Sequence, residues 1–149
     1  MKTMRVFFKI AVLAVLMAAC SSEDTDAPAR GSQPKTFDER MISGKKLYAS
    51  HCAACHQANG QGLTGAFPPL AQSSYLLDGP DDTINIILKS LSGPVTVNGM
   101  DYNAIMPNLS YLDDGEIAEI VTFVMNSWNN PGGEVSAAEV AAARAGGGD

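Results

Sequence analysis

The chain has few cysteines and histidines, and most of them lie in one short segment. Only three cysteines and two histidines occur among its 149 residues, and four of these five lie in HCAACH at 51–56. A structural zinc site needs four ligands, usually from two separated pairs, and no second cluster exists here. A thiol–disulfide oxidoreductase places its C-x-x-C pair near a βαβ pattern, but no predicted strand precedes this pair. Both kinds of site are therefore disfavoured.

The chain also lacks an apolar run long enough to span a bilayer. Near the N-terminus, Lys2, Arg5 and Lys9 precede the ten apolar residues IAVLAVLMAA, which end at Cys20. A positively charged segment followed by a short apolar segment is typical of a secretory signal. We therefore predict that residues 1–19 are a signal peptide.

The residues around Cys20 predict more than export. LMAAC at 16–20 resembles the bacterial lipoprotein signal, in which the cysteine becomes the lipidated first residue of the mature protein, although Met17 stands where that pattern prefers leucine. Lipidation at Cys20 would account for an otherwise unexplained third cysteine and would hold the protein at a membrane surface. Ser21 after the cysteine favours the outer membrane over the inner one, facing the periplasm. The alternative is an ordinary signal peptide with a free Cys20.

Basic residues are scarce in the predicted mature chain. Residues 1–19 contain three of the ten basic side chains and none of the sixteen acidic ones, so their removal leaves a formal charge of −9. Nucleic acid and anionic lipid headgroups are therefore poor partners. A basic patch on a partner protein is favoured, although the same charge would also simply keep the protein soluble.

The remaining sequence predicts one helical domain with a loop-rich middle. Hydrophobic residues make up 46% of the chain and charged residues 17%, which is not a disordered composition. Residues 20–36 form the lipidated cysteine and a flexible tether, residues 37–130 the domain, and residues 131–149 a tail with a short helix. That tail helix would be marginal by itself in water, so the sequence leaves open whether it docks or frays.

Cap and turn signals place the elements within these regions. Three of the predicted helices begin at the capping pairs Thr36/Glu39, Asp113/Glu116 and Ser136/Glu139. A further helix is predicted to have Asp81 or Asp82 as its N-cap, to include Leu91 and to end at Gly93-Pro94. The helix after Asp113 is expected to present an apolar face that reaches Trp128. Asn98-Gly99, between alternating residues, predicts a β-hairpin.

A covalently attached haem would use both cysteines and the second histidine of HCAACH. Cys52 and Cys55 can form thioethers with the two haem vinyl groups, since their spacing lets both sulfurs reach one side of the macrocycle. His56 follows directly and is placed to bind the iron as the proximal ligand. Export agrees, because haem of this type is attached outside the cytoplasm. The segment therefore predicts one haem c.

A second axial ligand has to come from a distant loop on the other haem face. Met106 is favoured, because Pro107 fixes the backbone there and disfavours a helix at Met106. Met100, beside the predicted hairpin turn, is an alternative, as is an iron without this ligand. The other candidates are expected to have different roles, Met41 and Met125 in core packing and His51 as a partly exposed helix residue.

Several motifs occur together along residues 37–130: Gly44-x-x-x-Tyr48-x-x-x-Cys52, CAACH, FPPL, YNAIMP, and a last helix with Phe123 and Trp128. In this combination the segment resembles a bacterial class I cytochrome c. The resemblance implies an all-α class I cytochrome c fold, with N- and C-terminal helices crossing over a covalently bound haem. It also implies a short β-hairpin before the loop that carries the methionine ligand.

The resemblance also implies roles for individual residues. Gly44 would let the first helix approach an aromatic residue of the last helix, with Tyr48, Phe123 and Trp128 at this crossing. The carbonyl of Pro68 would accept a hydrogen bond from the proximal imidazole, which fixes the ring. Leu70 would pack on the haem, and Tyr102 and Asn103 would hydrogen-bond near the haem or its propionates.

The function implied is one-electron transfer rather than catalysis. The run GPVTVNGMDYNAIMP at 93–107 most resembles cytochromes that are fused to or serve copper nitrite reductases and quinoprotein dehydrogenases. These enzymes, or a terminal oxidase, are the expected partner classes. The lysine ring of mitochondrial members is missing, so a partner that selects by an acidic docking patch is not expected. The alternative is a haem enzyme or gas-binding protein with an open or labile sixth iron site.

Overall fold

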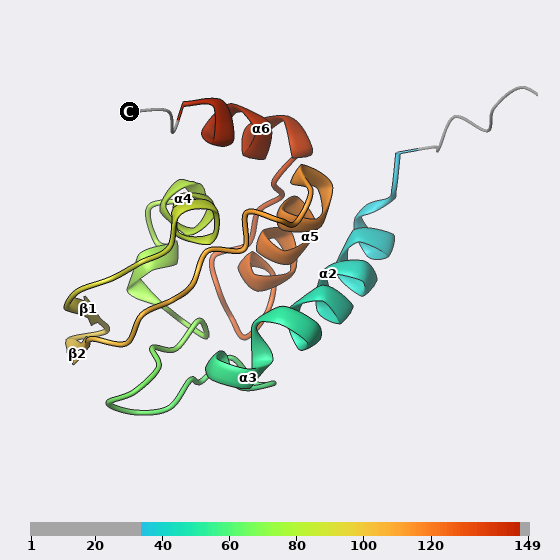
Figure 1. Cartoon of the computed structure of the whole chain (residues 1–149). Coiled ribbons are helices and arrows are strands. Elements are labelled where there is room, and N and C mark those ends of the chain that lie inside the picture. The colour runs from blue at the N-terminus through green and yellow to red at the C-terminus, as the bar shows by residue number, and fades with distance from the viewer. Residues whose placement is uncertain (1–33, 147–149) are drawn as a thin grey trace, which may run out of the picture. The chain divides into compact units, whose positions relative to one another are not determined.

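The structure is a computed structural model that describes residues 34–146. The predicted signal peptide, Cys20 and most of the predicted tether lie outside the described residues. The described part is mostly helical, as predicted, with the elements α2 (Phe37–His51), α3 (Ala53–His56), η1 (Ser74–Leu76), α4 (Asp81–Lys89), β1 (Val95–Val97), β2 (Met100–Tyr102), α5 (Asp114–Met125) and α6 (Ala137–Ala145) (Figure 1). Within residues 34–146, no helix has both the length and the apolar character needed to cross a bilayer.

Three helices begin at the capping boxes that the sequence predicted. In each box the side chain of the N-cap residue accepts a hydrogen bond from the backbone N–H of the acidic residue three positions later. The carboxylate of that acidic residue accepts a hydrogen bond from the backbone N–H of the N-cap residue. The pairs are Thr36 with Glu39 at α2, Asp113 with Glu116 at α5, and Ser136 with Glu139 at α6. These contacts satisfy backbone N–H groups that a helix leaves free at its N-terminus.

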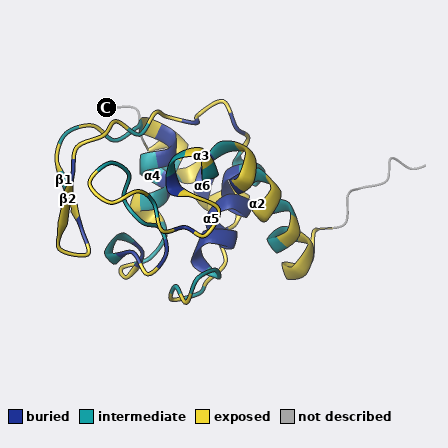
Figure 2. Ribbon diagram, turned by 90° about the horizontal axis from the view of Figure 1, so that it is seen from below, coloured by how far each residue is buried: buried dark blue, intermediate teal, exposed yellow. Residues whose placement is uncertain are grey.

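The core is built where α2 packs against α5, which is the most buried helix (Figure 2). Gly44 allows this contact, because a Cβ atom there would overlap the carbonyl oxygen of Glu119 and lie 2.8 Å from Cβ of Phe123. Tyr48, one turn further along α2, packs its ring 5.5 Å from that of Phe123, centroid to centroid. The close approach of Gly44 to an aromatic residue of the last core helix is therefore present.

Trp128 differs from the sequence prediction, which placed it on the last core helix. Helix α5 ends at Met125, and Trp128 has a φ of 53°. Its ring lies 5.2 Å from that of Tyr48 and 5.5 Å from that of Phe123. A Cβ atom on Gly60, which has a φ of 71°, would lie 2.6 Å from the Trp128 ring. Tertiary packing against this glycine and the aromatic cluster thus replaces the extra helical turn.

The prediction for α4 was wrong at both ends. Its N-cap residue is Pro80, without a side-chain hydrogen bond, so neither Asp81 nor Asp82 caps the helix. The helix stops at Lys89, and Ser90 follows with a φ of 80°. Leu91 therefore leaves the helix and forms an isolated antiparallel bridge with Met106. The reason is tertiary, since backbone pairing with a distant loop competes successfully with the last helical turn.

The predicted hairpin is present. Val97 pairs with Met100 on either side of Asn98 and Gly99, which have φ values of 50° and 77°. Two successive positive φ values are what a two-residue type I′ turn requires.

The tail helix, whose docking the sequence left open, packs against α4 and α5 (Figure 1). Val135 and Val140, the predicted hydrophobic staple, are 1% and 0% exposed and belong to the main core cluster. Arg40 of α2 also reaches this segment, pairing with Glu134 at 2.8 Å and bonding the carbonyl of Val135. The core therefore continues beyond residue 130.

Candidate functional site

A cavity with an apolar lining lies between the cysteine cluster, α4 and the loop that follows β2. It has two lobes, which share the lining residues Cys52, His56, Pro68, Leu91, Val95 and Met106. The lining of both lobes contains no Asp, Glu, Lys or Arg side chain among residues 34–146. Concave sites lined mainly by apolar side chains are typical of sites for cofactors and other small molecules, so the lining suits a large apolar group.

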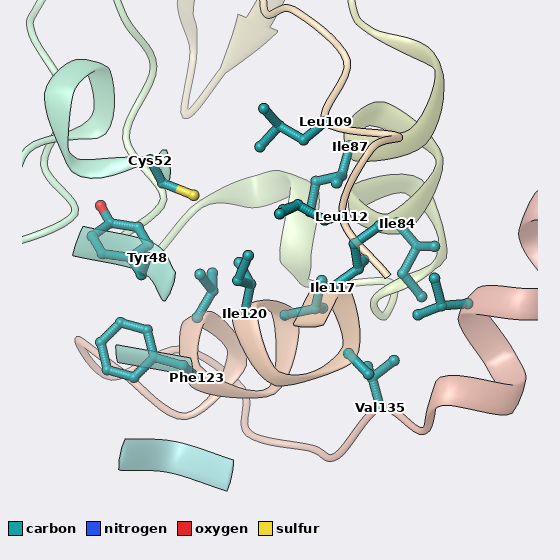
Figure 3. Close-up of a cluster of buried hydrophobic side chains, with 14 of the residues drawn as sticks. Tyr48, Cys52, Ile84, Ile87, Leu109, Leu112, Ile117, Ile120, Phe123 and Val135 are labelled. Atoms are coloured by element: carbon teal, nitrogen blue, oxygen red, sulfur yellow. The ribbon is translucent and has the colours of Figure 1, made fainter. Parts of the chain in front are cut away.

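The two cysteines of C-x-x-C occupy one edge of this cavity. Cys52 lies at the break between α2 and α3 and is buried, and Cys55 in α3 is half-buried. Cys52 lines both lobes and Cys55 lines the second. Figure 3 shows the Cys52 sulfur pointing into the interior, toward Ile87 and Leu109 on the opposite wall. Both sulfurs thus border the cavity.

The environment of Cys52 argues against thiol redox chemistry. Burial, followed by the neighbouring Cys55, raises the pKa of the Cys52 thiol to about 11. The reactive first cysteine of a redox C-x-x-C motif instead has a lowered pKa, because the thiolate is the nucleophile.

His56 is held at the end of α3 with one ring nitrogen committed to the protein. Its Nδ1 donates to the carbonyl oxygen of Pro68 at 2.9 Å. Burial lowers the pKa of His56, and the hydrogen bond to Pro68 opposes this only in part. Within the described residues, Nε2 has no hydrogen-bond partner, and the side chain lines both lobes. The result is a neutral imidazole with a fixed tautomer, which is the form that binds a metal.

The glycine-rich loop after α3 places the Pro68 carbonyl beside His56. Gly62 donates its backbone N–H to the carbonyl of His56 at 2.9 Å, and Leu70 donates to Gly60 at 2.8 Å. A Cβ atom on Gly62 would lie 2.5 Å from the Pro68 carbonyl oxygen. Gly62 also has a φ of 64°, which glycine adopts without steric cost. Position 62 therefore favours glycine both for its close approach to Pro68 and for its backbone conformation.

Met106 reaches the same cavity from the far side of the sequence. Its backbone pairs with Leu91 through two hydrogen bonds of 3.0 Å, so the loop is attached to the end of α4. Met106 lines both lobes. The methionines weighed as alternatives, all within the described residues, do not line either lobe: Met41 packs against the core, Met125 is buried in it, and Met100 on β2 is 42% exposed.

Two of the residues expected to support the haem, Leu70 and Tyr102, line the cavity, and a third, Asn103, does not. Leu70 lines the first lobe and the buried Tyr102 lines the second. Asn103 is exposed and is not part of the lining. Sequence reasoning did not assign wall positions to Leu91 and Val95, which line both lobes. Leu91 follows Ile87 by four residues, and this spacing of apolar residues was the signal available in the sequence. It was interpreted only as the continuation of a helix.

The donors around this cavity fit a haem better than a bare metal ion. Within residues 34–146, no three His, Cys, Asp or Glu side chains come together to hold an ion. One imidazole, one thioether sulfur and two thiols instead surround a large apolar space, which suits a covalently attached haem. Comparison with known sequences bears on the same point, since the sequence model of the cytochrome c family matches residues 42–128. The chain belongs to the cytochrome c family. It is a cytochrome with covalently bound haem c, and the size of the domain fits a single haem.

The cytochrome is similar to a cytochrome c-552 and to cytochrome c subunits of dehydrogenases. Cytochrome c-552 from Thermus thermophilus is 42% identical over 94 residues, which cover 60% of this chain and 71% of that protein. The cytochrome c subunit of alcohol dehydrogenase (quinone) from Gluconobacter oxydans is 34% identical over 101 residues, 66% of this chain and 21% of that subunit. The cytochrome c subunit of gluconate 2-dehydrogenase from Pantoea cypripedii is 33% identical over 106 residues, 68% and 24% of the two chains.

Proposed function

We propose that this cytochrome is a membrane-anchored electron carrier that passes single electrons between redox proteins, with His56 and Met106 as the axial ligands of its haem. The single observation that carries the proposal is that His56 and Met106, fifty residues apart in sequence, line one cavity whose edge holds Cys52 and Cys55. With both axial positions filled by the protein, no iron position is left for a substrate. The proposed role is therefore transfer and not catalysis.

The chain's own residues would keep the site unchanged during transfer. When bound, the haem supplies an iron that gains or loses one electron. The Pro68 carbonyl holds the His56 ring, and the Leu91 pairing holds the Met106 backbone, so neither ligand has to move. A thioether sulfur in place of a second imidazole favours the reduced ion, and an apolar cavity adds to this preference. We therefore expect a positive reduction potential.

Membrane anchoring and the partners are supported by the sequence and by the relatives. Lipidation of Cys20 would keep the haem domain close to a membrane and raise its effective concentration near membrane partners. Relatives that are subunits of alcohol, gluconate and fructose dehydrogenases favour a dehydrogenase as the electron donor. A copper nitrite reductase or a terminal oxidase is the proposed acceptor class, and the outer membrane facing the periplasm is the proposed location.

The ligation is tested by optical spectra of the haem-loaded protein. A low-spin spectrum, with the weak far-red sulfur-to-iron band in the ferric state and no response of the ferrous state to carbon monoxide, is expected. Met106→Leu should lose the far-red band, bind carbon monoxide in the ferrous state and have a lower reduction potential. The matched variant Met100→Leu should behave like the wild type in all three measurements. A wild-type protein that is high-spin and binds carbon monoxide at once would instead support the haem enzyme or gas-binding alternative.

The anchor is tested separately. Mass spectrometry of the N-terminal peptide should find acyl chains on Cys20, and Cys20→Ser should release the cytochrome from the membrane fraction with its spectrum unchanged. A soluble wild-type protein with an unmodified Cys20 would refute the anchor and leave the proposed ligation intact.

A further inference from the structure

The segment 68–74 forms the wall of the first lobe beside His56, and other parts of the chain hold it in place. The residues of this segment that line the lobe are Pro68, Pro69, Leu70 and Ser73. Both prolines lack an N–H group, and the Pro68 carbonyl is already bonded to His56. Within residues 34–146, no backbone hydrogen bond joins two members of the segment. Its position therefore depends on partners elsewhere in the chain.

Asn130, beyond the end of α5, binds this segment at two points. Its Nδ2 donates to the carbonyl oxygen of Leu70 at 3.0 Å, and its Oδ1 accepts from the backbone N–H of Gln72 at 2.6 Å. The same amide nitrogen donates to the carbonyl oxygen of Val124 in α5 at 2.7 Å. One side chain thus joins the wall of the lobe to the most buried helix of the domain.

Asn98, at the tip of the β-hairpin, binds the same segment from another direction. Its Nδ2 donates to the carbonyl oxygen of Gln72 at 3.1 Å, and its Oδ1 accepts from the backbone N–H of Ser74 at 2.8 Å. Its own backbone N–H donates to Oγ of Ser74 at 3.1 Å. Both backbone polar groups of Gln72 are therefore bonded to asparagine side chains, which lie 58 and 26 residues away in sequence.

The backbone conformation of Gln72 explains why it needs this support. Its φ is 51°, in the left-handed region that a residue with a Cβ atom adopts only at a cost. Such a conformation persists where the surrounding contacts fix it. The side chain of Gln72 is exposed, so its own packing contributes little. The two asparagines therefore keep the chain in the turn that completes the wall of the lobe.

Pro69 couples the position of Leu70 to the direction of the Pro68 carbonyl. Its ring fixes its own φ and disfavours the helical region for Pro68. Few rotations are therefore left between the Pro68 carbonyl and Leu70. When Leu70 is released from Asn130, the carbonyl has to move with it.

We propose that Asn130 and Asn98 are positioning residues for the proximal haem ligand. By holding the turn at Gln72, they keep the Pro68 carbonyl at Nδ1 of His56. This role rests on the proposed axial ligation by His56 and adds the residues that fix the ligand. The hydrogen bond at Nδ1 makes the imidazole a stronger donor to the iron, which favours the ferric state. Loss of either asparagine should therefore loosen this bond and raise the reduction potential.

Nuclear magnetic resonance of the haem-loaded full chain in the ferrous state tests this role. The measured quantity is the exchange rate of the His56 Nδ1–H proton with solvent deuterium, relative to the exchange of the α5 backbone amides. Asn130→Ala should accelerate the Nδ1–H exchange at least about tenfold more than it accelerates the amides. At a fixed applied potential, the ratio of ferrous to ferric protein should also rise at least about twofold.

Asn126→Ala is the matched control. Asn126 also joins the end of α5 to a loop, since its Nδ2 donates to the carbonyl oxygen of Thr122 at 2.8 Å and to that of Gly133 at 2.5 Å. Neither Gly133 nor Asn126 lines a lobe of the cavity. Asn126→Ala should lower the free energy of unfolding and leave the potential and the relative Nδ1–H exchange at their wild-type values.

Asn98→Ala is the second variant, because Asn98 makes no hydrogen bond to α5 within the described residues. Its effects should have the same sign as those of Asn130→Ala and be smaller, since Asn98 binds residues further from Pro68. Accelerated Nδ1–H exchange in both of these variants, but not in Asn126→Ala, supports the proposal.

Two other outcomes would count against it at different levels. Nδ1–H exchange that stays at the wild-type rate in the Asn98 and Asn130 variants, or that follows the amides in all three variants, would overturn the positioning role and leave the electron-carrier function intact. A wild-type ferrous protein in which the His56 ring protons lack the upfield shift of a haem-bound imidazole would overturn the proposed ligation itself.

Discussion

Arg144 of α6 donates a hydrogen bond from Nη2 to the carbonyl oxygen of Leu112, at 2.9 Å. The same guanidinium donates from Nη1 to the carbonyl of Ser110 at 2.8 Å and from Nε to Asp114 at 2.9 Å. The tail helix thereby holds the segment that leads from Met106 into α5. One side chain near the C-terminus, remote in sequence from the cysteine cluster, is thus connected to the loop of the proposed sixth ligand.

Removing this connection should loosen the Met106 loop. Arg144→Ala removes a hydrogen bond that stabilises the closed form of the loop by about 1 kcal/mol. The equilibrium between the open and closed loop should therefore shift about fivefold toward the open form. We therefore expect added imidazole to displace Met106 from the ferric protein at about one fifth of the wild-type concentration. Titration of the far-red band measures this.

Lys35→Ala is the control for Arg144→Ala. It removes the 2.5 Å pair with Glu119 at the contact between α2 and α5, away from the Met106 loop. It should lower the free energy of unfolding without changing the imidazole titration. If both variants lower the imidazole concentration needed to displace Met106 in proportion to their loss of unfolding free energy, Arg144 has a merely structural role.

Gly44→Ala should destabilise the protein severely for a single methyl group. The new Cβ would overlap the backbone of Glu119, which cannot move as a flexible side chain does. Overpacking of this kind costs about 1–3 kcal/mol and sometimes more. Gly115→Ala, where the nearest neighbouring atom is the Asp113 Oδ1 at 3.2 Å, should change stability by less than about 1 kcal/mol. Denaturant unfolding of both haem-loaded variants distinguishes steric overlap from a general intolerance of alanine.

Val140→Ala tests whether docking of α6 stabilises the whole domain. Val140 is fully buried, so its truncation should cost about 2 kcal/mol by analogy with other buried aliphatic residues. Ala141→Ser, at the exposed neighbouring position, should cost less than about 0.5 kcal/mol. Equal, small losses in thermal unfolding would mean that α6 detaches without affecting the core.

Acid should weaken the cap of α6. The pKa of Glu139 lies below its ordinary value, first because its carboxylate accepts from the backbone of Ser136 and next because it accepts from the Ser136 hydroxyl. A lowered folded-state pKa gives stability that is present above the unfolded-state pKa and lost as pH falls through the folded-state value. Glu139→Gln keeps an acceptor without a titrating group, so its stability should fall less than the wild type's between about pH 6 and about pH 3.

Asp38→Asn is the comparison for this pH experiment. It also removes a carboxylate from the first turn of a helix, but that carboxylate makes no hydrogen bond within the described residues. The two variants therefore differ in whether the replaced carboxylate belongs to a helix cap. A Glu139→Gln profile that follows the wild type would show that the cap does not contribute to acid sensitivity.

The sequence correctly predicted those features that depend on residues three or four positions apart. Each capping box joins residues i and i+3, and the Asn98-Gly99 turn needs only its own two positive φ values. Such contacts form within one element and do not depend on where the rest of the chain goes. Two errors occurred where a distant segment intervened, at Leu91, which pairs with Met106, and at Trp128, which packs on Gly60. The N-cap of α4, which is Pro80, was a local error.

By itself, the sequence determined the chemistry available to this cytochrome: two thiols and an imidazole in one short segment, a methionine followed by proline, and helices of fixed start and apolar face. Only the tertiary structure decided that His56 and Met106 line the same cavity and that α6 docks. Residue types and short spacings fix local bonding. Shared cavities and surfaces arise from long-range packing, which a single sequence does not display.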